Sequence, residues 1–491
     1  MDSKNNKIYI IGAGFAGIEI ARELKRKEIF GKVIGFIDDD IQKMGSNIDG
    51  IPVFGPIKNA RKIQSEQPAD EAIIAIPGAA GDSLKRIYSI LKDTDINTIR
   101  LLPGISQIID GDAHLIQTRE VSAEDLLGRD SAVISLKESL SYLRGKRVLI
   151  TGAGGSIGSE LSRQLLSGGA QRLYLLDHGE NNLYEIEAEL KLLQEEGVGE
   201  AATIVPVVGD LQDREFMTFI LSRLKADVIF HCAAYKHVPM MEKNPVEAIK
   251  NNVFGTRNLV DAAIKNNVSK FVLISTDKAV EPVSVYGASK MIAEEIVLSG
   301  NSEKTEMMVV RFGNVLGSSG SIVPLFQKQI NKGGPVTITH PQIKRFFMTI
   351  PEAASLVLKT GGVGSGGTLY LLDMGEPILI KDLAEQMIKF YGFRPDKDIK
   401  LLDIGLRPGE KLEEKLWSSN EKPERTDHPG IIKLNKEPNF GRNLKSLIEQ
   451  LYDICFFNSD NFIAYRNRKK LRQTIKNYIP QLEVPENEPE Y

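Results

Sequence analysis

Residues 146–158 read KRVLITGAGGSIG, an apolar run that ends in a turn rich in glycine. The helix-like segment SELSRQLLSGG follows at 159–169, and a second apolar run, RLYLLD, follows at 172–177. This order predicts a strand, a helix and a parallel strand, which is the unit of a doubly wound α/β sheet. Further apolar runs alternate with helical segments and extend the prediction, at residues 226–234, 270–276, 307–313 and 368–374.

The same pattern occurs at the start of the sequence. An apolar run at 7–12, KIYIIG, is followed by an amphipathic segment at 18–27 and by a second run, KVIGFIDDD, at 32–40. We therefore predict an α/β protein with two tandem Rossmann-like domains and parallel sheets, the second with a smaller mixed C-terminal region that binds the substrate. The expected limits are 1–118 for the first domain, 119–145 for a connector, 146–420 for the second domain and 421–491 for a helical extension and tail. The final residues, PENEPEY, are expected to lack order.

Composition narrows the class of partner. Charged residues make up 26% of the sequence and the net charge is −3, so there is no basic field that nucleic acid would need. The two cysteines, Cys232 and Cys455, are too few for a disulfide framework and lack metal-ligand spacing. His231 and His237 form no zinc-like pattern either, so we expect no catalytic metal. No apolar run reaches the roughly 18 residues that span a bilayer, and we expect a cytoplasmic protein.

The first glycine turn has the GxGxxG spacing of a nucleotide site. Gly12, Gly14 and Gly17 follow a strand, and three aspartates, Asp38 to Asp40, end the next one. Glycine lets the backbone approach a pyrophosphate at a helix N-terminus, where free N–H groups favour negative charge. No catalytic motif follows, so two interpretations stay open: a site for a nucleotide or a coenzyme A-like ligand, or a domain that only packs or binds a regulator.

The second glycine turn predicts a dinucleotide site more strongly. Gly152, Gly155 and Gly158 have TGxxGxxG spacing, and Asp177 lies 19 residues after Gly158 at the end of the next strand. A carboxylate there hydrogen-bonds the adenosine ribose and repels a 2′-phosphate, which favours NAD over NADP. Asp210, in VVGDL at a later strand end, can contact the adenine; a loop carboxylate in water is the alternative.

A tyrosine and a lysine four residues apart follow the strand at 270–276. In Tyr286-Gly-Ala-Ser-Lys290 this spacing places both side chains on one face of a helix. The ammonium of Lys290 can stabilise the phenolate of Tyr286 and hold the nicotinamide ribose, so the pair forms a base for a hydroxyl proton. An exposed surface pair is the alternative for this spacing alone, but the glycine turn and the strand that ends in Ser-Thr favour the catalytic interpretation.

Thr276-Asp277-Lys278, at the end of that strand, predicts an elimination. Oxidation of a sugar hydroxyl at C4 acidifies the proton on C5, and loss of the C6 hydroxyl then needs a base at C5 and an acid at the leaving oxygen. We assign the base to a neutral Lys278 and the acid to a protonated Asp277, which requires both pKa values to shift inward in a desolvated cleft. A solvated surface pair is the alternative, but the carboxyl edge of such a sheet is where ligands bind.

Together these residues resemble the nucleotide-sugar dehydratases of bacterial surface-glycan synthesis, in particular the large UDP-N-acetylglucosamine 4,6-dehydratases. The resemblance covers nearly the whole chain and is carried by the segments GFIDDD, EDLLGRD, TGAGGSIGSEL, LLDHGENNLYEIE, FHCAAYKHVPMME, STDKAVEP, RFGNVLGSSGSIVPLF, ITHPQIKRFFMTIPEA and GLRPGEKLEEKL. It implies a UDP-N-acetylhexosamine substrate and NAD-dependent 4,6-dehydration of UDP-N-acetylglucosamine to a 2-acetamido-2,6-dideoxy-hexos-4-ulose, with an NAD that stays bound through the cycle. We also expect a homo-oligomer.

The resemblance also implies roles for individual residues. The catalytic set is Thr276, Asp277, Lys278, Tyr286, Lys290 and Tyr235. The cofactor set is Gly152, Gly155, Ser156, Ile157, Gly158, Asp177, Asp210, Leu211, Ala233, Ala234, Asn252, Tyr286 and Lys290. The substrate set is Lys236, Asn314, Ser318, Ser321, Arg345, Arg407 and Glu410. Arg345 and Arg407 suit a diphosphate clamp, because guanidinium donors match phosphate oxygens in pairs, although either arginine alone can be a surface charge.

Two features depart from the large relatives. Those relatives usually carry membrane-spanning helices ahead of the first domain; we expect none here and do not infer membrane attachment. Many of them have methionine where this sequence has Tyr286, so the base for the C4 hydroxyl proton stays open among Tyr286, Thr276 and Tyr235. For Tyr235, a core aromatic whose hydroxyl bonds to backbone is the structural alternative.

Alternatives remain for the reaction itself. Length and Asp177 favour retention over inversion at C5. A UDP-sugar 4-epimerase or a 4-keto reductase uses the same turn and the same Tyr-Lys pair, but has no use for Asp277 and Lys278. A non-catalytic nucleotide-sensing protein is the alternative from another class, and the intact Thr-Asp-Lys and Tyr-x-x-x-Lys motifs speak against it.

Overall fold

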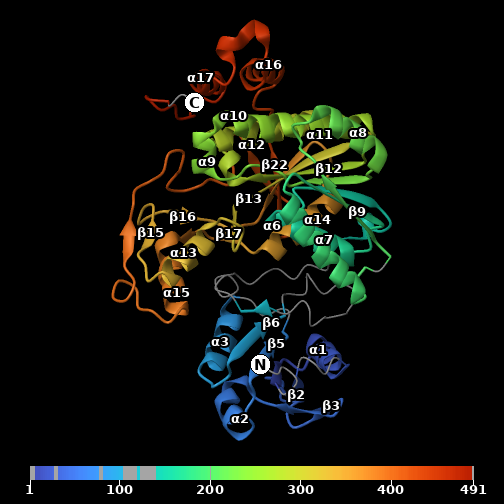
Figure 1. Cartoon of the computed structure of the whole chain (residues 1–491), viewed down its shortest axis with the longest axis vertical. Coiled ribbons are helices and arrows are strands. Elements are labelled where there is room, and N and C mark those ends of the chain that lie inside the picture. The colour runs from blue at the N-terminus through green and yellow to red at the C-terminus, as the bar shows by residue number, and fades with distance from the viewer. Residues whose placement is uncertain are drawn as a thin grey trace. The chain divides into compact units, whose positions relative to one another are not determined.

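The computed structural model describes residues 6–26, 31–76, 81–102, 119–121, 140–199 and 201–488. The chain divides into two compact units, which are Met1–Glu138 with Leu193–Val198, and Ser139–Leu192 with Gly199–Tyr491. The predicted connector at 119–145 falls largely outside the described residues, so its limits stay a prediction. Both units are α/β (Figure 1), and the predicted fold class is confirmed.

The first unit has a Rossmann-like sheet with the strand order β3-β4-β2-β1-β5-β6-β7. Strands β4, β2, β1, β5 and β6 are parallel, whereas β3 and β7 pair antiparallel at the two edges. The central strands are buried on both faces, which explains why they appear in the sequence as unbroken apolar runs. The strands and helices are β1 Lys7–Ile11, α1 Phe15–Arg26, β2 Lys32–Ile37, β3 Asn47–Ile48, β4 Ile51–Phe54, α2 Ala60–Glu66, β5 Glu71–Ile74, α3 Gly81–Lys92, β6 Thr98–Leu101 and β7 Arg119–Glu120.

The second unit carries, within the described residues, a nine-stranded sheet with the order β10-β9-β8-β11-β12-β13-β18-β22-β21. The strands from β10 to β18 are parallel, and β22 and β21 add an antiparallel edge. The order reverses between β8 and β11, and ligands of such sheets bind beyond the carboxyl ends of the strands at that reversal. The strands are β8 Arg147–Thr151, β9 Arg172–Asp177, β10 Thr203–Val208, β11 Val228–His231, β12 Lys270–Thr276, β13 Glu306–Phe312, β18 Thr368–Leu372, β21 Lys422–Arg425 and β22 Ile431–Asn435.

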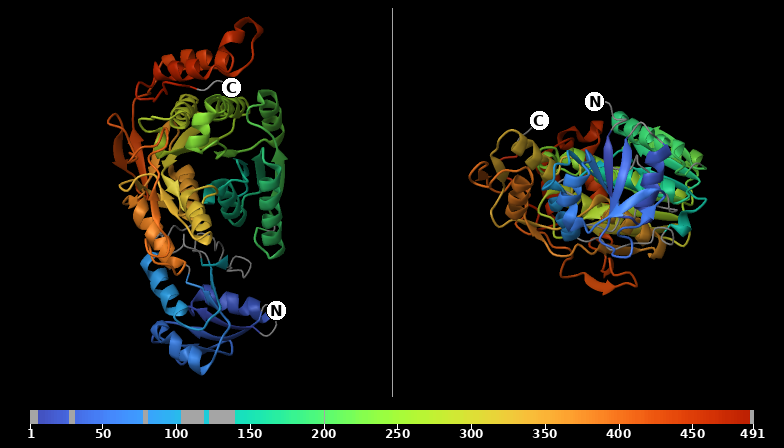
Figure 2. Two further views of the ribbon diagram at one scale, coloured as in Figure 1. Left: turned by 60° about the vertical axis from the view of Figure 1, so that its left-hand side comes forward. Right: turned by 90° about the horizontal axis from the view of Figure 1, so that it is seen from below.

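Helices cover both faces of this sheet (Figure 1, Figure 2). One layer comprises α8 Arg214–Leu224, α9 Val238–Lys243, α10 Pro245–Ile249, α11 Thr256–Lys265 and α12 Val285–Ser299. The other comprises α6 Ser156–Ser167, α7 Glu180–Glu195 and α14 Ile350–Val363. A mixed region beside the carboxyl edge contains β14 Asn314–Val315, α13 Ile322–Asn331, β15 Val336–Ile338, β16 Lys344–Arg345, β17 Phe347–Met348, β19 Ile378–Leu379, α15 Ile380–Phe390 and β20 Leu401–Asp403.

The C-terminal part differs from the prediction in two ways. Residues 422–435 were expected to begin a helical extension, but they form β21 and β22 and lengthen the main sheet. The helices start later, with α16 Asn443–Cys455 and α17 Arg468–Lys476, and both pack against α10. The expectation of a disordered end is wrong for Glu488, because this carboxylate accepts hydrogen bonds from the buried guanidinium groups of Arg468 and Arg472 at 2.7 and 2.6 Å.

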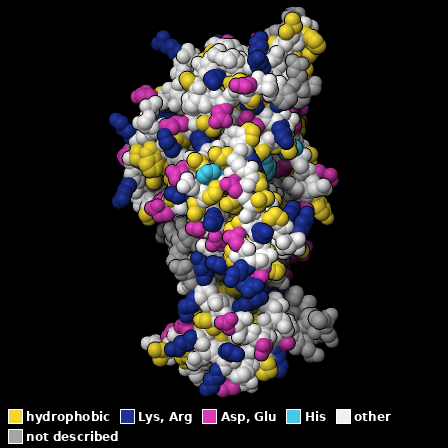
Figure 3. Space-filling view, turned by 90° about the vertical axis from the view of Figure 1, so that its left-hand side faces the viewer, with side chains coloured by type: hydrophobic (Ala, Val, Ile, Leu, Met, Phe, Trp, Pro, Cys, Tyr) yellow, Lys and Arg dark blue, Asp and Glu magenta, His cyan; other side chains and the backbone are white. Residues whose placement is uncertain are grey.

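The surface carries charges of both signs. On the face shown in Figure 3, acidic and basic side chains are intermixed over the second unit, as the nearly balanced composition predicts. Hydrophobic side chains are exposed at the tip between α16 and α17, where Phe457, Phe462 and Ile463 lie. Among the residues that the structure describes, none of the helices combines the length and the apolar character needed to cross a membrane.

Candidate active site

The turn that follows β8 has room only for glycine at two positions. Gly152 has a φ of +67°, and a Cβ on it would lie 2.7 Å from the backbone nitrogen of Ala233. A Cβ on Gly158 would lie 2.1 Å from the carbonyl oxygen of Gly152. The turn therefore stays tight, and α6 begins directly after it, so the free N–H groups and the positive dipole end of α6 lie at the carboxyl edge of the sheet.

Asp177 fixes this turn from the end of β9. Its two carboxylate oxygens accept hydrogen bonds from the N–H groups of Gly154 and Gly179 at 3.0 and 2.9 Å. The first unit repeats the arrangement, because Asp38 accepts the N–H groups of Ala13 and Asp40 at 2.6 and 2.8 Å. Burial opposes the ionised form of Asp38, but these hydrogen bonds hold its pKa below the ordinary value. The sequence repeat thus extends to the carboxylate that braces each glycine turn.

A cavity of about 680 Å³ opens at this edge of the second unit. It is lined by the glycine turn, by the segment after β11, by the end of β12, by the first turns of α12 and by the loop before α13. It brings together most of the residues predicted for the site: Gly152, Gly155, Ser156, Ile157, Gly158, Ala234, Tyr235, Lys236, Thr276, Lys278, Tyr286, Lys290, Asn314, Ser318 and Ser321.

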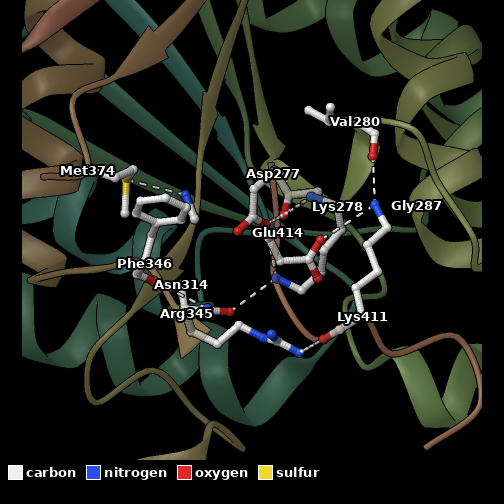
Figure 4. A network of polar contacts seen from close by, with 12 residues as sticks. Asp277, Lys278, Val280, Gly287, Asn314, Arg345, Phe346, Met374, Lys411 and Glu414 are labelled. Carbon is white, nitrogen blue, oxygen red and sulfur yellow. Dashed lines mark hydrogen bonds and ion pairs between the residues drawn. The ribbon is translucent and has the colours of Figure 1, made fainter. Parts of the chain in front are cut away.

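Asp277 and Lys278 form a buried ion pair directly after β12. Lys278 Nζ lies 2.9 Å from Asp277 Oδ1, and the same oxygen accepts the hydroxyl of Thr276 at 2.9 Å. Lys278 Nζ also donates to Asn314 Oδ1 at 3.2 Å (Figure 4). Asp277 is fully buried, and its Oδ2 has no hydrogen-bond partner among the described residues. Of the pair, Lys278 lines the cavity, whereas Asp277 lies behind it, outside the lining, with one carboxylate oxygen that no described group binds.

The prediction that both pKa values shift inward is wrong for Lys278. Burial favours the neutral amine, but the negative charges of Asp277 and Glu414 outweigh it and raise the pKa of Lys278 above its ordinary value. In the structure Lys278 is thus favoured as the ammonium ion, because a carboxylate at hydrogen-bond distance stabilises its charged form.

Tyr286 belongs to the same cluster, but Lys290 does not. Burial raises the pKa of Tyr286 to about 12, and the positive charge of Lys278 opposes this shift. Lys290 Nζ instead donates to the carbonyl of Ile274 at 2.8 Å, and burial lowers its pKa to about 8. The expectation that Lys290 stabilises the phenolate is therefore corrected: in this structure Lys278 has that position.

Tyr235 lies at another part of the cavity. Its ring packs edge-on against His178, and burial raises its pKa, with further contributions from the charges of Asp210 and Glu247. Asn252, predicted to contact the cofactor, is 1% exposed and does not line the cavity. Its side-chain oxygen accepts the N–H of Tyr235 at 2.9 Å, and its amide donates to the carbonyl of Tyr235 at 3.0 Å, so Asn252 fixes the backbone behind Tyr235.

The remaining members of the predicted cofactor set lie outside the lining. Asp210 is exposed, and its carboxylate caps the N–H of Gln212 at 2.9 Å. Leu211 is buried in the core, and Ala233 packs against the glycine turn rather than the cavity. Their roles toward a cofactor stay predictions.

The predicted diphosphate clamp is not assembled as expected. Arg345 is buried, and its guanidinium donates to the carbonyl groups of Lys411 and Leu412 at 2.7 and 3.0 Å and to Glu410 Oε1 at 3.4 Å. It therefore anchors the segment that carries Glu410. Arg407 is exposed, and its backbone N–H donates to Glu410 Oε2 at 3.2 Å. Arg345, Arg407 and Glu410 are absent from the cavity lining among the described residues.

Glu414 is a site residue that the sequence analysis missed. It is 9% exposed, its Oε2 has no hydrogen-bond partner among the described residues, and its nearest cation is Lys411 Nζ at 3.6 Å. Lys411 Nζ in turn donates to the carbonyl of Val280 at 2.8 Å. Figure 4 shows that Glu414 lies beside Lys278. The segment GLRPGEKLEEKL contains this carboxylate, next to the exposed Glu413. What distinguishes Glu414 from Glu413 is its proximity to Lys278, a residue far away in the sequence.

His231 has a structural position. It is 1% exposed at the end of β11, and its two ring nitrogens hydrogen-bond the hydroxyl groups of Thr151 and Thr256 at 2.7 and 2.9 Å. Burial lowers its pKa to about 3, so the ring is neutral. Within the described part of the chain, no cluster of His, Cys, Asp and Glu side chains has the arrangement of a metal site.

Comparison with known proteins identifies the family. The family described as "Polysaccharide biosynthesis protein" matches residues 148–436, which contain the glycine turn, the Asp277–Lys278 pair and Glu414. The chain belongs to this family. The predicted resemblance to nucleotide-sugar dehydratases is confirmed at this level, because relatives in the comparison carry both kinds of name.

Three relatives illustrate the range of similarity. The chain is 41% identical over 419 residues to "Probable polysaccharide biosynthesis protein EpsC" of Bacillus subtilis, covering 85% of this chain and 69% of that protein. It is 31% identical over 343 residues to "UDP-N-acetylglucosamine 4,6-dehydratase (inverting)" of Campylobacter jejuni, covering 67% of this chain and 97% of that enzyme. The X-ray structure of Pen from Bacillus thuringiensis is 32% identical, with a TM-score of 0.54 over 60% of this chain and 88% of Pen.

Proposed function

We propose that the protein removes water from UDP-N-acetylglucosamine across C5 and C6 and yields a UDP-2-acetamido-2,6-dideoxy-hexos-4-ulose for surface-glycan synthesis. The observation that carries this proposal is the Asp277–Lys278 ion pair: Lys278 lines the same cavity as Tyr286 and the glycine turn, and the fully buried Asp277 lies directly behind it. A 4-epimerase needs the turn and the phenol only. An acid and a base side by side are what an elimination requires.

The proposed cofactor is NAD, and the residues present fit it. Gly152 and Gly158 leave no room for a Cβ, so the backbone of the turn can lie against a pyrophosphate at the start of α6. Lys290 and Tyr286 line the cavity beyond the turn, where a nicotinamide ribose needs donors. NAD, when bound, supplies the oxidation at C4 and the later reduction at C6. Asp177 at the end of β9 supports NAD over NADP.

The proton steps follow from the ion pair. Tyr286 takes the C4 hydroxyl proton, helped by the positive charge of Lys278. Transfer of one proton along the 2.9 Å hydrogen bond converts ammonium and carboxylate into amine and carboxylic acid without any change of net charge. Desolvation by a bound sugar favours this neutral form of the pair. Lys278 then accepts the C5 proton, the C6–O bond breaks, and Asp277 protonates the departing hydroxyl, which leaves as water.

The choice of substrate is supported by the relatives and by the lining. The Campylobacter enzyme is named for UDP-N-acetylglucosamine, and Asn314, Ser318 and Ser321 offer polar groups to a nucleotide sugar. We propose retention at C5, on the basis of chain length and Asp177, whereas the Campylobacter enzyme is named as inverting. The configuration at C5 is therefore a measured outcome of the test.

The test uses the purified full chain, UDP-N-acetylglucosamine and no added reductant. Mass spectrometry should find a product lighter by one water, and NMR should show a C6 methyl group and the configuration at C5. A product of unchanged mass with an inverted C4 would establish an epimerase and reject the proposal. An unchanged sugar nucleotide would reject both enzymes.

A further inference from the structure

Glu242 holds the first turn of the helix that carries Tyr286. Its Oε1 accepts the N–H of Val285, the first residue of α12, at 2.7 Å, and Tyr286 is the next residue. Ser284 accepts the N–H of Gly287 at 3.1 Å. A helix leaves its first N–H groups without intrahelical partners, and a carboxylate there also interacts favourably with the helix dipole. Glu242 and Ser284 together therefore fix where α12 begins.

The C-terminal extension holds Glu242 in turn. Arg472, on α17 and 1% exposed, donates to Glu242 Oε2 and to the Glu242 carbonyl, both at 2.7 Å. Its Nε donates to Glu488 Oε2 at 2.6 Å, and Glu488 Oε1 accepts from Arg468 at 2.7 Å. A further hydrogen bond joins the C-terminal extension to the segment just before α12: the N–H of Glu483 donates to the carbonyl of Val283 at 3.0 Å.

The partners that the extension contributes, Arg468, Arg472, Glu483 and Glu488, lie outside the residues that the family model matches. The family match ends at residue 436, before α16 and α17. Nevertheless the buried side chains of Leu451, Leu471 and Ile475 belong to the same core cluster as Val285 and Tyr286. The extension is therefore packed onto the active-site layer and is not a separate appendage.

The loop that carries Glu410 meets the same carboxylate. Gly409 has a φ of +73°, and a Cβ on it would lie 2.8 Å from Ser284 Cβ and 3.4 Å from Glu242 Cδ. Glu242 thus hydrogen-bonds the start of α12 and the extension, and the predicted substrate loop lies close to it. A shift of this one side chain alters the packing of all three.

We propose that Arg472 is a positioning residue, which acts through Glu242 to place the Tyr286 end of α12, so that the C-terminal extension completes the active site. The inference rests on the proposed function for its kinetic consequence. Without the guanidinium, the Glu242 carboxylate, which is 10% exposed, loses its charge partner and moves toward water. The N–H of Val285 then loses its acceptor, the first turn of α12 loosens, and the phenol of Tyr286 leaves its place beside Lys278.

The test compares four single variants of the full chain and the double variant of Arg472→Met with Val285→Pro. Arg472→Met removes the guanidinium, Arg472→Lys restores one donor, and Lys469→Met changes an exposed residue of the same helix as a control. Val285→Pro removes the N–H that Glu242 accepts and keeps an apolar side chain at this buried position. Proline is favoured at the first position of a helix, and Ser284, at φ −111° and ψ 156°, already has the backbone conformation that precedes proline. Measured are kcat, KM for UDP-N-acetylglucosamine, and hydrogen exchange of the amides of residues 283–288.

We expect Arg472→Met and Val285→Pro each to lower kcat about tenfold, to leave KM within about twofold, and to speed exchange at 283–288. Arg472→Lys should recover part of kcat, and Lys469→Met should match the wild type. Arg472→Met and Val285→Pro both interrupt the contacts that run from Arg472 through Glu242 to the N–H of Val285. The double variant should therefore lose no more of its kcat than either single variant. Unchanged kcat and unchanged exchange in Arg472→Met, or losses that multiply in the double variant, would overturn the inference.

The two proposals fail separately. If the wild type forms no dehydrated product, the proposed function is lost, and hydrogen exchange alone still decides whether Arg472 places the start of α12. If Arg472→Met does not fold, two other variants replace it. Glu488→Gln weakens the ion pair that holds Arg472, and Val285→Pro removes the hydrogen bond between Glu242 and α12. Wild-type exchange at 283–288 in both would reject the inference.

Discussion

Lys278 Nζ lies 2.9 Å from Asp277 Oδ1, and the aspartate is fully buried. The two side chains are neighbours in sequence and still face each other, because Asp277 and Lys278 leave β12 in a short 3-10 turn rather than continuing as a strand, in which successive side chains point to opposite faces. A proton can therefore move within the pair without crossing solvent. This is the relationship on which the proposed elimination depends.

Asp277→Asn and Lys278→Met should each lower dehydration by at least about 10²-fold, which is the size of a lost acid or base. The double variant should lose little more than either single variant, because the two groups act as one unit. Formation of the dehydrated product is followed by mass spectrometry. Lys415→Met is the control, since Lys415 forms an exposed ion pair with Glu281 at 2.8 Å. Full activity in the double variant would remove the acid-base assignment.

Tyr286→Phe should reduce kcat far more than Tyr235→Phe. The phenol of Tyr286 lies near the charge of Lys278, whereas the charged neighbours of Tyr235 are Asp210 and Glu247. Loss of a general base lowers kcat by about 10²- to 10⁴-fold. Steady-state kinetics with UDP-N-acetylglucosamine measure both variants. The reverse ranking would assign the C4 base to Tyr235.

Much of the fold could be predicted because its signals are local. The glycine turns, the apolar strands and the start of α12 each depend on residues close in sequence, and the structure contains them. The Asp277–Lys278 contact was predictable for the same reason, since the two residues are adjacent. Strands β21 and β22 were missed, because both are short and β21 is exposed throughout and rich in charged residues, so they carry little periodic signal.

The errors in the site come from long-range contacts. Arg345 was predicted to bind a diphosphate, and this role stays a prediction, but its guanidinium also hydrogen-bonds backbone carbonyl groups 66 and 67 residues away, which the sequence did not indicate. Glu414 looked like its neighbour Glu413, although one is buried beside Lys278 and the other is exposed. Sequence spacing cannot report which guanidinium or carboxylate a distant segment will cover.

Glu414→Gln should move the acid limb of the pH profile of kcat to lower pH. Burial lowers the pKa of Lys278, but the negative charges of Asp277 and Glu414 together raise it above its ordinary value. Removal of the negative charge of Glu414 lowers the pKa of Lys278, so the amine persists to a lower pH. Glu413→Gln, the exposed neighbour, should leave the profile in place. A shift in the opposite direction would contradict the role of Glu414.

Stability should fall in mild acid because of His231. Burial lowers the pKa of His231 from 6.5 to about 3, so the folded state excludes a proton that the unfolded chain binds. The contribution of His231 to the free energy of unfolding is complete above pH 6.5. It decreases as the pH falls toward 3, by about 1.4 kcal/mol per pH unit. Urea unfolding at several pH values measures this slope. His231→Asn should reduce it, whereas the exposed His178→Asn should not; equal slopes in all three proteins would refute the assignment.

Arg311→Met should destabilise the second unit strongly. Arg311 is 1% exposed and binds Glu294 at 2.7 Å and Glu421 at 2.9 Å, and Glu294 also accepts the hydroxyl of Ser275 at 2.6 Å. Its removal leaves two buried carboxylates without their shared cation, which costs about 3–5 kcal/mol. Calorimetry or urea unfolding tests the loss, with Arg394→Met as the control, because Arg394 pairs with Asp398 on the surface.

The position of Arg311 extends this prediction to the active site. Ser275 immediately precedes Thr276, and Glu421 follows the segment that carries Glu414, so the guanidinium ties the end of β12 to that segment. Arg311→Met should therefore lower kcat even at temperatures where the variant is fully folded. A variant that is as stable as the wild type would mean that the carboxylates take up protons or water at little cost, and the buried network would then have no part in holding the catalytic strand.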